Sequence, residues 1–292
     1  MTNLDLTLDH TGVAVRNLDE AEAAYKRLGF TLTTRSIHSG SVTPGAPVTP
    51  WGSGNYCAMF REGYLEIIGI TDPNLYSSTG DLLDKYEGQH IVAFGSGDAD
   101  VAYEALSQRI DGVSPAAALE RMADFGPDNS ESKLAQFRNI WVDRTAMPEA
   151  KIIFIEHITP DVIWQPHLLD HLNGAVKLAE IALCVPDKAN TCARLNKLLG
   201  REPKDLNPDF STYEMERGRV YVLSEKGLAS WAPGVTPPAL PYAAGFGVEV
   251  TDLTATKYFL KSNGVTYHDH PYPAIWVGPE FTHGPVVSFI QS

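Results

Sequence analysis

Cysteine is scarce in this sequence, and the few cysteines present are not arranged for chemistry. The chain has 292 residues and 3 cysteines, Cys57, Cys184 and Cys192, with no CxxC pair. This usage rules out a thiolate zinc cluster and is typical of a reducing compartment. The first residues, MTNLDLTLDH, lack a basic stretch followed by an apolar one, and no run of about 18 apolar residues occurs. We therefore expect a cytoplasmic protein without a signal peptide or a membrane-spanning segment.

Positive charge is also scarce. The chain has 23 Lys and Arg against 36 Asp and Glu, a formal net charge of −13. Such a surface repels phosphate groups, which argues against a nucleic-acid or anionic-membrane partner. The expected partner is a small-molecule substrate. The acidic surface and the exposed sheet edges permit a homodimer without requiring one.

Four segments of the chain share one pattern: a short alternating strand, an Asp or Asn cap, an amphipathic helix and a glycine. They begin at DHTGVAV, QHIVAFG, AEIALCV and GFGVEV. In the first copy Leu18, Ala21 and Tyr25 recur at helical spacing, and Gly29 closes the helix. Further β-like segments follow each helix. Each copy therefore predicts a βαβββ unit.

A βαβββ unit has one helix on a four-stranded sheet, which leaves the other face of the sheet uncovered. Two units side by side would curve their sheets around a shared cleft. We therefore predict an α+β fold of four βαβββ modules forming two paired-module domains with curved mixed β-sheets around a cleft. The polar segment 157–176, which holds two prolines, is interpreted as the connection between the pairs. This divides the chain into a first domain over residues 1–172 and a second over 173–292.

The stretch LDHTGVAVRNLDEAEAAYKRLGF, followed by GYLEIIG, resembles the vicinal oxygen chelate superfamily of glyoxalases, bleomycin-resistance proteins and extradiol dioxygenases. Within it, the chain is similar to the glyoxalase-like group. The resemblance is specific over residues 7–70, extends over 86–158, and rests on the repeat pattern alone over 175–292. It implies a metal site built from the first and last strands of paired units.

Four residues of the first two units match that implied metal site. Aligning the first strands places His10 with His90, and aligning the last strands places Glu66 with Glu156. Two imidazoles and two carboxylates suit a divalent ion, either Zn, Ni, Co, Mn or Fe(II). A lone strand histidine more often only bonds a neighbour, and that alternative stays open for His10.

The second pair of units provides an internal control. Its equivalent positions are Glu180, Tyr221, Gly245 and roughly Val287. This set cannot hold a transition metal, so we interpret the second domain as degenerate. Histidine is therefore not simply the residue that this strand position prefers.

Other residues are weaker candidates. His157 follows Glu156, so on a strand the two side chains point to opposite faces and only one of them can face the cleft. Glu156 matches the repeat pattern better, and we place it in the cleft. Five residues are candidates for substrate contacts: His38, Asn55, Arg61, Arg138 and Trp51. Each also has a structural interpretation, as a solvated or capping histidine, a turn asparagine, an outward-facing arginine or a core tryptophan.

The resemblance implies metal-assisted proton transfer next to a carbonyl, of the isomerase or lyase type, on a small substrate chelated through adjacent oxygens. Glu156 or Glu66 would act as the general base. An extradiol ring-cleaving dioxygenase with Fe(II), which uses two His and one Glu, is one alternative. A non-catalytic protein that sequesters a small molecule is the other.

Overall fold

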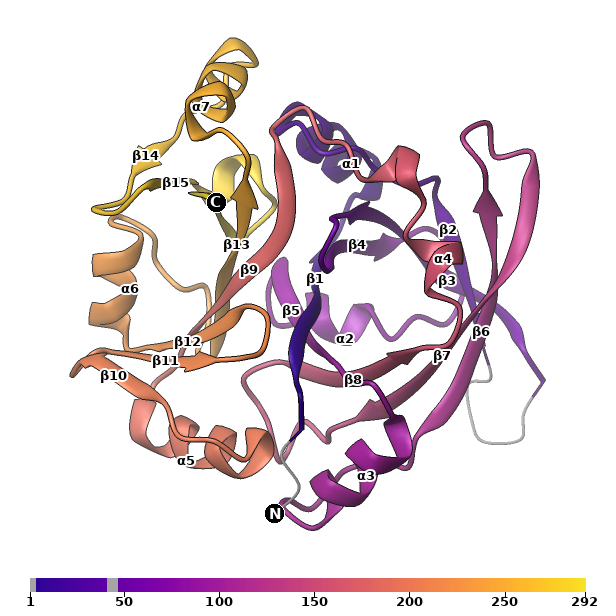
Figure 1. Ribbon diagram of the computed structural model, residues 1–292, viewed down its shortest axis with the longest axis horizontal. Helices are drawn as coiled ribbons and strands as arrows, with labels where there is room; N and C mark the ends of the chain where they lie inside the picture. Colours follow the sequence, from indigo (N-terminus) through magenta and orange to yellow (C-terminus); the bar gives the residue numbers. More distant parts are fainter. Residues whose placement is uncertain (1–3, 41–46) are drawn as a thin grey trace.

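The four predicted repeats are present as four βαβββ units (Figure 1). A computed structural model describes residues 4–40 and 47–292 of the chain. The first unit consists of β1 (Thr7–Val15), α1 (Leu18–Arg27), β2 (Ser36–Gly40), β3 (Thr49–Met59) and β4 (Tyr64–Ile70). The second consists of β5 (Gly88–Gly95), α3 (Ala99–Ser107), β6 (Ala117–Phe125), β7 (Glu131–Trp141) and β8 (Lys151–His157). The α+β fold prediction is confirmed.

The second half of the chain repeats this order. Its third unit consists of β9 (Ala175–Cys184), α5 (Lys188–Leu199), β10 (Lys204–Asn207), β11 (Phe210–Glu214) and β12 (Arg219–Leu223). The fourth consists of β13 (Tyr242–Val250), α7 (Leu253–Ser262), β14 (His268–Asp269), β15 (Ala274–Val277) and β16 (Val286–Gln291). Short helices connect the units: α2 (Gly80–Leu83), α4 (Pro160–Ile163), the 3₁₀ turn Pro166–Leu168 and α6 (Glu225–Trp231). A second 3₁₀ turn, Pro279–Phe281, lies within the fourth unit, between β15 and β16.

Each long helix begins where a polar side chain caps it. The Asn17 side chain accepts the backbone N–H groups of Asp19 and Glu20 at the start of α1, and Asp98, Asp187 and Asp252 cap α3, α5 and α7 in the same way. These bonds satisfy donors that the first turn of a helix leaves free. Gly29, with φ +93°, lets the chain turn away after α1.

Units pair through their first strands. β1 runs antiparallel to β5 and parallel to β4, and β5 runs parallel to β8. The second half has the same arrangement, with β9 antiparallel to β13. The halves meet where β13 pairs with β5 at Ala243 and Gln89. Figure 1 shows the first half in indigo to magenta on the right and the second in orange to yellow on the left.

Apart from the contact between β13 and β5, the strands up to β8 pair with one another and the strands from β9 onward pair with one another. The connecting segment contains α4 and the turn Pro166–Leu168, where the sequence pattern predicted neither a whole strand nor a whole helix. One apolar core, however, contains residues of both halves, such as Leu65 and Phe289. The division into domains 1–172 and 173–292 stays a prediction.

Each half has a sheet with two unlike faces. In the first half, Ile152 and Phe154 of β8 pack with the long helices in the main core. Ile153 and Ile155 point to the other side, which we call the inner face, and pack there with Cys57. α4 and the residues after it cover part of the inner face, because Ile163 and Trp164 belong to the same apolar cluster.

No helix within residues 4–40 and 47–292 is both long enough and apolar enough to cross a membrane.

Candidate functional site

A bulge in β1 places two adjacent polar residues at the inner face. Leu8 pairs with Phe94 and His10 with Ala93, so Asp9 is the extra residue of the bulge. Both Asp9 and His10 are buried, at 3% and 4% exposure. The bulge thereby brings a carboxylate and an imidazole inside the protein side by side.

Asp9 joins two histidines that are far apart in the sequence. Its Oδ1 accepts the Nδ1–H of His10 at 2.7 Å, and its Oδ2 accepts the Nε2–H of His157 at 3.0 Å. Burial alone would raise the pKa of the Asp9 carboxyl, but the two hydrogen bonds outweigh it and hold that pKa well below its usual range. Asp9 is therefore a carboxylate, which fixes one nitrogen of each imidazole as a donor.

Aromatic rings hold these imidazoles in place. Tyr64 stacks on His10 with ring centres 4.4 Å apart, and Trp164 meets His157 edge-on at 4.7 Å. The second nitrogen of His157, Nδ1, is buried and has no hydrogen-bond partner among the described residues.

A second polar group lies further along the inner face. The Asn55 side chain of β3 donates to Glu66 Oε1 of β4 at 2.6 Å, which orients that carboxylate. His38 of β2 bonds the Ser53 hydroxyl at 3.0 Å. Burial lowers the pKa of His38, against the opposing charge of Glu66. Asn55 and His38, predicted as substrate contacts, therefore lie beside Glu66.

Lys151 was not among the site residues predicted from the sequence. It begins β8, two positions before Ile153, and so belongs to the inner face. Burial lowers the pKa of its ammonium group, and the nearby Glu66 carboxylate acts in the opposite direction. The signal available in the sequence was a lysine in phase with the inner-face isoleucines of an apolar strand. Glu66, Asn55 and Lys151 together form a candidate acid–base set.

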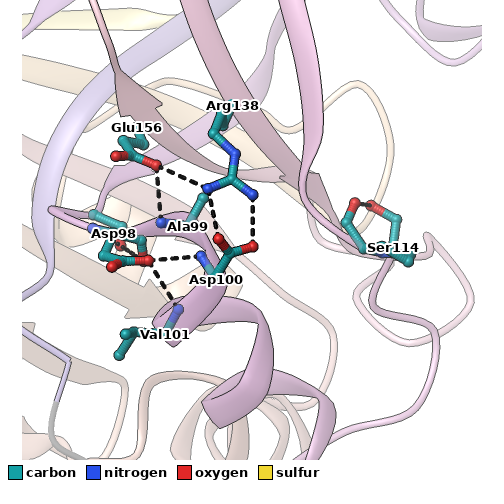
Figure 2. Close-up of polar contacts among 9 residues, drawn as sticks. Asp98, Ala99, Asp100, Val101, Ser114, Arg138 and Glu156 are labelled. Atoms are coloured by element: carbon teal, nitrogen blue, oxygen red, sulfur yellow. Dashed lines mark hydrogen bonds and ion pairs between the residues drawn. The ribbon is translucent and has the colours of Figure 1, made fainter.

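Glu156 does not belong to the inner face, and its placement in the cleft was wrong. Its Oε2 accepts the backbone N–H of Ala99, at the start of α3, at 3.0 Å. Figure 2 shows the carboxylate above this helix end, next to Arg138. Glu156 lies on the helix side of β8 together with Ile152 and Phe154, because alternate residues of a strand share a face. His157, the alternative, is the inner-face residue.

The strand register explains this error. Glu66 of β4 pairs with Gly12, two residues after His10. Two residues after His90 stands Val92, whose partner on β8 is Ile152, four positions before Glu156. The alignment that equated Glu66 with Glu156 was therefore wrong.

His90 also points elsewhere. It lies at a second register shift between β1 and β5, its ring stacks on Tyr86 at 4.0 Å, and its Nε2–H donates to the Tyr86 carbonyl at 2.8 Å. Burial lowers the pKa of His90 to about 4. Tyr86 in turn packs with Tyr242 of the second half. His90 thus lies at the junction between the halves.

The four predicted metal ligands, His10, Glu66, His90 and Glu156, are therefore not brought together. Across residues 4–40 and 47–292, no group of three or more His, Cys, Asp or Glu side chains is placed to hold a metal ion. The donor set required for the predicted four-residue metal site does not fit this geometry, because Glu156 is used by a helix and His90 by a backbone carbonyl.

The remaining predicted substrate contacts are scattered. Arg138 forms a two-pronged pair with the Asp100 carboxylate at 2.8 and 2.5 Å on the helix side (Figure 2). The Trp51 indole donates to the Gly40 carbonyl and packs on Tyr76, within the β2–β3 hairpin region. Arg61 is exposed on the turn between β3 and β4 and lines a pocket. Residues 41–46, between β2 and β3, lie outside the described residues.

Comparisons with known proteins agree with this fold. The sequence profile of the glyoxalase-like domain family matches residues 8–199. A search of curated proteins finds no match to the chain.

Solved structures align over almost the whole chain at low sequence identity. A hypothetical protein from Staphylococcus aureus has a TM-score of 0.62 and 11% identity, covering 98% of this chain and 100% of that one. A mutant 4-hydroxymandelate synthase from Streptomyces coelicolor has a TM-score of 0.59 and 11% identity, covering 99% and 93%. A Mn(II)-bound glyoxalase from Novosphingobium aromaticivorans has a TM-score of 0.56 and 10% identity, covering 100% and 83%. At such identities the likeness establishes the fold alone.

Proposed function

Because the chain belongs to the glyoxalase-like domain family of the vicinal oxygen chelate superfamily, we propose that its first half is a proton-transfer enzyme. The substrate is a small molecule with a carbonyl and an adjacent oxygen, and the reaction is of the isomerase or lyase type. The observation that carries the proposal is the Glu66 carboxylate, held by Asn55 at 2.6 Å on the inner face. A carboxylate with one oxygen fixed leaves the other free to take a proton.

The roles follow from charge and position. Glu66 is the general base that removes a proton from the carbon next to the carbonyl. Lys151 is the cation that stabilises the negative charge developing on the carbonyl oxygen, since burial strengthens such an interaction. Asn55 keeps Glu66 in position. Glu66 returns the proton to the former carbonyl carbon, and the proton of the adjacent hydroxyl passes to the oxygen that Lys151 stabilises. Isomerisation results, with no net loss of atoms or charge.

The thiol next to this set takes no part. Cys57 lies on the inner face, and burial raises the pKa of its thiol to about 12, so the thiolate that a nucleophile needs is not formed at neutral pH.

No step of this proposal passes through a metal. The predicted four-residue site does not fit the structure, because Glu156 and His90 are engaged elsewhere. A ring-cleaving dioxygenase needs two histidines and a carboxylate around one iron, and no such set is placed to hold a metal ion within residues 4–40 and 47–292, which argues against this alternative.

The test is deuterium incorporation, followed by NMR, into hydroxyacetone, dihydroxyacetone and pyruvate in heavy water. We expect enzyme-dependent exchange that falls at least about 100-fold in Glu66→Gln, the usual loss on removing a general base. Glu156→Gln, the matched carboxylate on the helix side, should keep full exchange. Exchange by Glu66→Gln at the wild-type rate would refute the proposal. Binding without any exchange would favour the sequestering function instead.

A further inference from the structure

A pocket of about 360 Å³ lies at the junction of the two halves, separate from Glu66 and Lys151. It is lined by the start of β1, the residues after β5, the β3–β4 turn, α4 and Trp164 of the first half. The second half contributes Arg217, on the turn between β11 and β12. The two halves are in direct contact here, since the Leu8 backbone N–H donates to the Arg217 carbonyl at 2.8 Å. The volume of the pocket suits a small ligand.

The pocket carries both signs of charge. Asp5, Asp9 and Glu62 are negative, and Arg61 and Arg217 are positive. Asp9 is buried at 3% exposure, whereas Arg61 and Glu62 are exposed on the turn. A ligand with a single charge would meet repulsion as well as attraction here, whereas a zwitterion would satisfy both signs.

Two buried atoms of the lining residues, one on Arg217 and one on His157, lack hydrogen-bond partners among the residues that the structure describes. Arg217 Nε is a donor, and the Glu62 carboxylate is too far to bond it, at 3.8 Å. His157 bonds the Asp9 carboxylate through Nε2, and Nδ1 is its atom without a partner. An unpaired buried polar atom is costly, so a ligand that drew either side chain toward the pocket and gave its atom a partner would recover that cost.

The wall between these groups is apolar. Trp164 and Ile155 line the pocket and also belong to the apolar cluster of the inner face. Trp164 is fixed at both ends, since its indole N–H donates to the Phe60 carbonyl at 3.0 Å and its ring contacts His157. A rigid aromatic wall favours a ligand with an apolar side chain.

We propose that this pocket binds a free α-amino acid with an apolar side chain. The carboxylate of the ligand accepts from Arg217 and Arg61. Its ammonium group lies in the field of Asp5 and Asp9, beside His157, and its side chain packs on Trp164. This site is independent of the proton-transfer site, and occupying it joins the two halves through one ligand.

The experiment is calorimetric titration of the full chain with L-alanine, L-leucine and L-phenylalanine. We expect at least one to bind with a Kd below about 1 mM. Two analogues of leucine separate the charges: 4-methylpentanoate lacks the amine, and 3-methylbutylamine lacks the carboxylate. Each should bind about 10- to 100-fold more weakly than leucine, the effect of losing a hydrogen bond to a charged group.

Variants locate the binding. Arg217→Gln and His157→Phe should each weaken leucine binding about 10-fold or more. Arg217 lies on a turn, so its variant keeps the test valid if His157→Phe does not fold. Arg27→Gln is the matched control, because Arg27 lies over the Phe281 ring, away from the pocket. Glu66→Gln should bind normally, which separates this site from the proposed active site.

Three outcomes would overturn the proposal. One is the absence of binding by all three amino acids at about 10 mM, well above the expected Kd. Another is equal affinity for leucine and 4-methylpentanoate, which would make the pocket a simple anion site. The third is unchanged leucine binding in Arg217→Gln, which would place the ligand elsewhere.

Discussion

Glu156 and His157 are consecutive residues of β8, and their side chains serve opposite faces of one sheet. Glu156 accepts the Ala99 backbone N–H at the start of α3, and His157 donates to the Asp9 carboxylate in the interior. A single peptide unit therefore separates a helix-capping contact from a buried imidazole–carboxylate pair.

Glu156→Ala should lower the free energy of unfolding by about 1 kcal/mol, the usual effect of losing an acceptor at a helix start. Glu156→Gln keeps an acceptor oxygen and should recover most of this loss. Urea unfolding followed by circular dichroism measures both variants. Equal destabilisation by the two would show that the charge next to Arg138, rather than the bond to Ala99, matters.

Asp9→Asn should destabilise the protein by about 2 kcal/mol at pH 7, since an amide has one acceptor oxygen and leaves one imidazole N–H without a partner. The pKa of Asp9 is lowered on folding, so the carboxylate stabilises the native state above its usual value of 3.8. That stabilisation is lost as the pH falls through the folded value. The gap between variant and wild type should therefore shrink at pH 3, as denaturant unfolding at both pH values would reveal. A constant gap would contradict the assignment.

Glu180, in the second half, should make the stability of the protein depend on pH in the opposite direction. Burial raises the pKa of its carboxyl from 4.5 to about 7, against the lowering effect of Arg219 at 3.6 Å, and Glu214 and Glu249 add to the rise. A raised folded pKa gives stability that is complete below 4.5 and is lost as the pH rises through 7. Glu180→Gln removes this loss.

The wild type should therefore lose on the order of 2–3 kcal/mol relative to Glu180→Gln between pH 4.5 and 8. Guanidinium unfolding across this range provides the comparison. Parallel stability curves for the two proteins would show that Glu180 does not titrate in the folded state.

Gly12→Ala should lower the free energy of unfolding by about 1–3 kcal/mol, the range for overpacking a core. Gly12 lies opposite Ile91 between β1 and β5, and an added Cβ would stand 2.6 Å from Ile91 Cδ1. The double variant Gly12→Ala/Ile91→Val should recover part of the lost free energy of unfolding. Gly80→Ala is the control, since nothing lies within 4 Å of its added Cβ. Similar melting temperatures for both glycine variants would contradict the prediction.

The fold was predictable from the sequence because its signals are local. Each long helix follows its capping residue, as Asn17 and Asp98 illustrate, and short β-like segments follow each of these helices. Because this pattern occurs four times, few arrangements of the strands and helices are compatible with the sequence.

The candidate site was predictable only in part, because it depends on register. Glu66 and Asn55 were singled out from adjacent strands whose pairing the pattern implies. The choice of Glu156 over His157 failed because nothing local reveals which face of β8 meets Asp9, 148 residues away in sequence. The bulges at Asp9 and His90 likewise change which side chain faces inward, and a periodic pattern contains no such step.

The contact between α1 and the fourth unit bears on how the molecule comes apart. The Tyr25 hydroxyl donates to the Thr282 carbonyl at 2.9 Å, and the Phe30 and Phe289 rings lie 6.0 Å apart in the core that both halves share. Neither half can melt without exposing apolar surface of the other, so heating should give one calorimetric transition in place of two. A duplicated architecture thus behaves as a single cooperative body, in which damage to either end is felt by the whole chain.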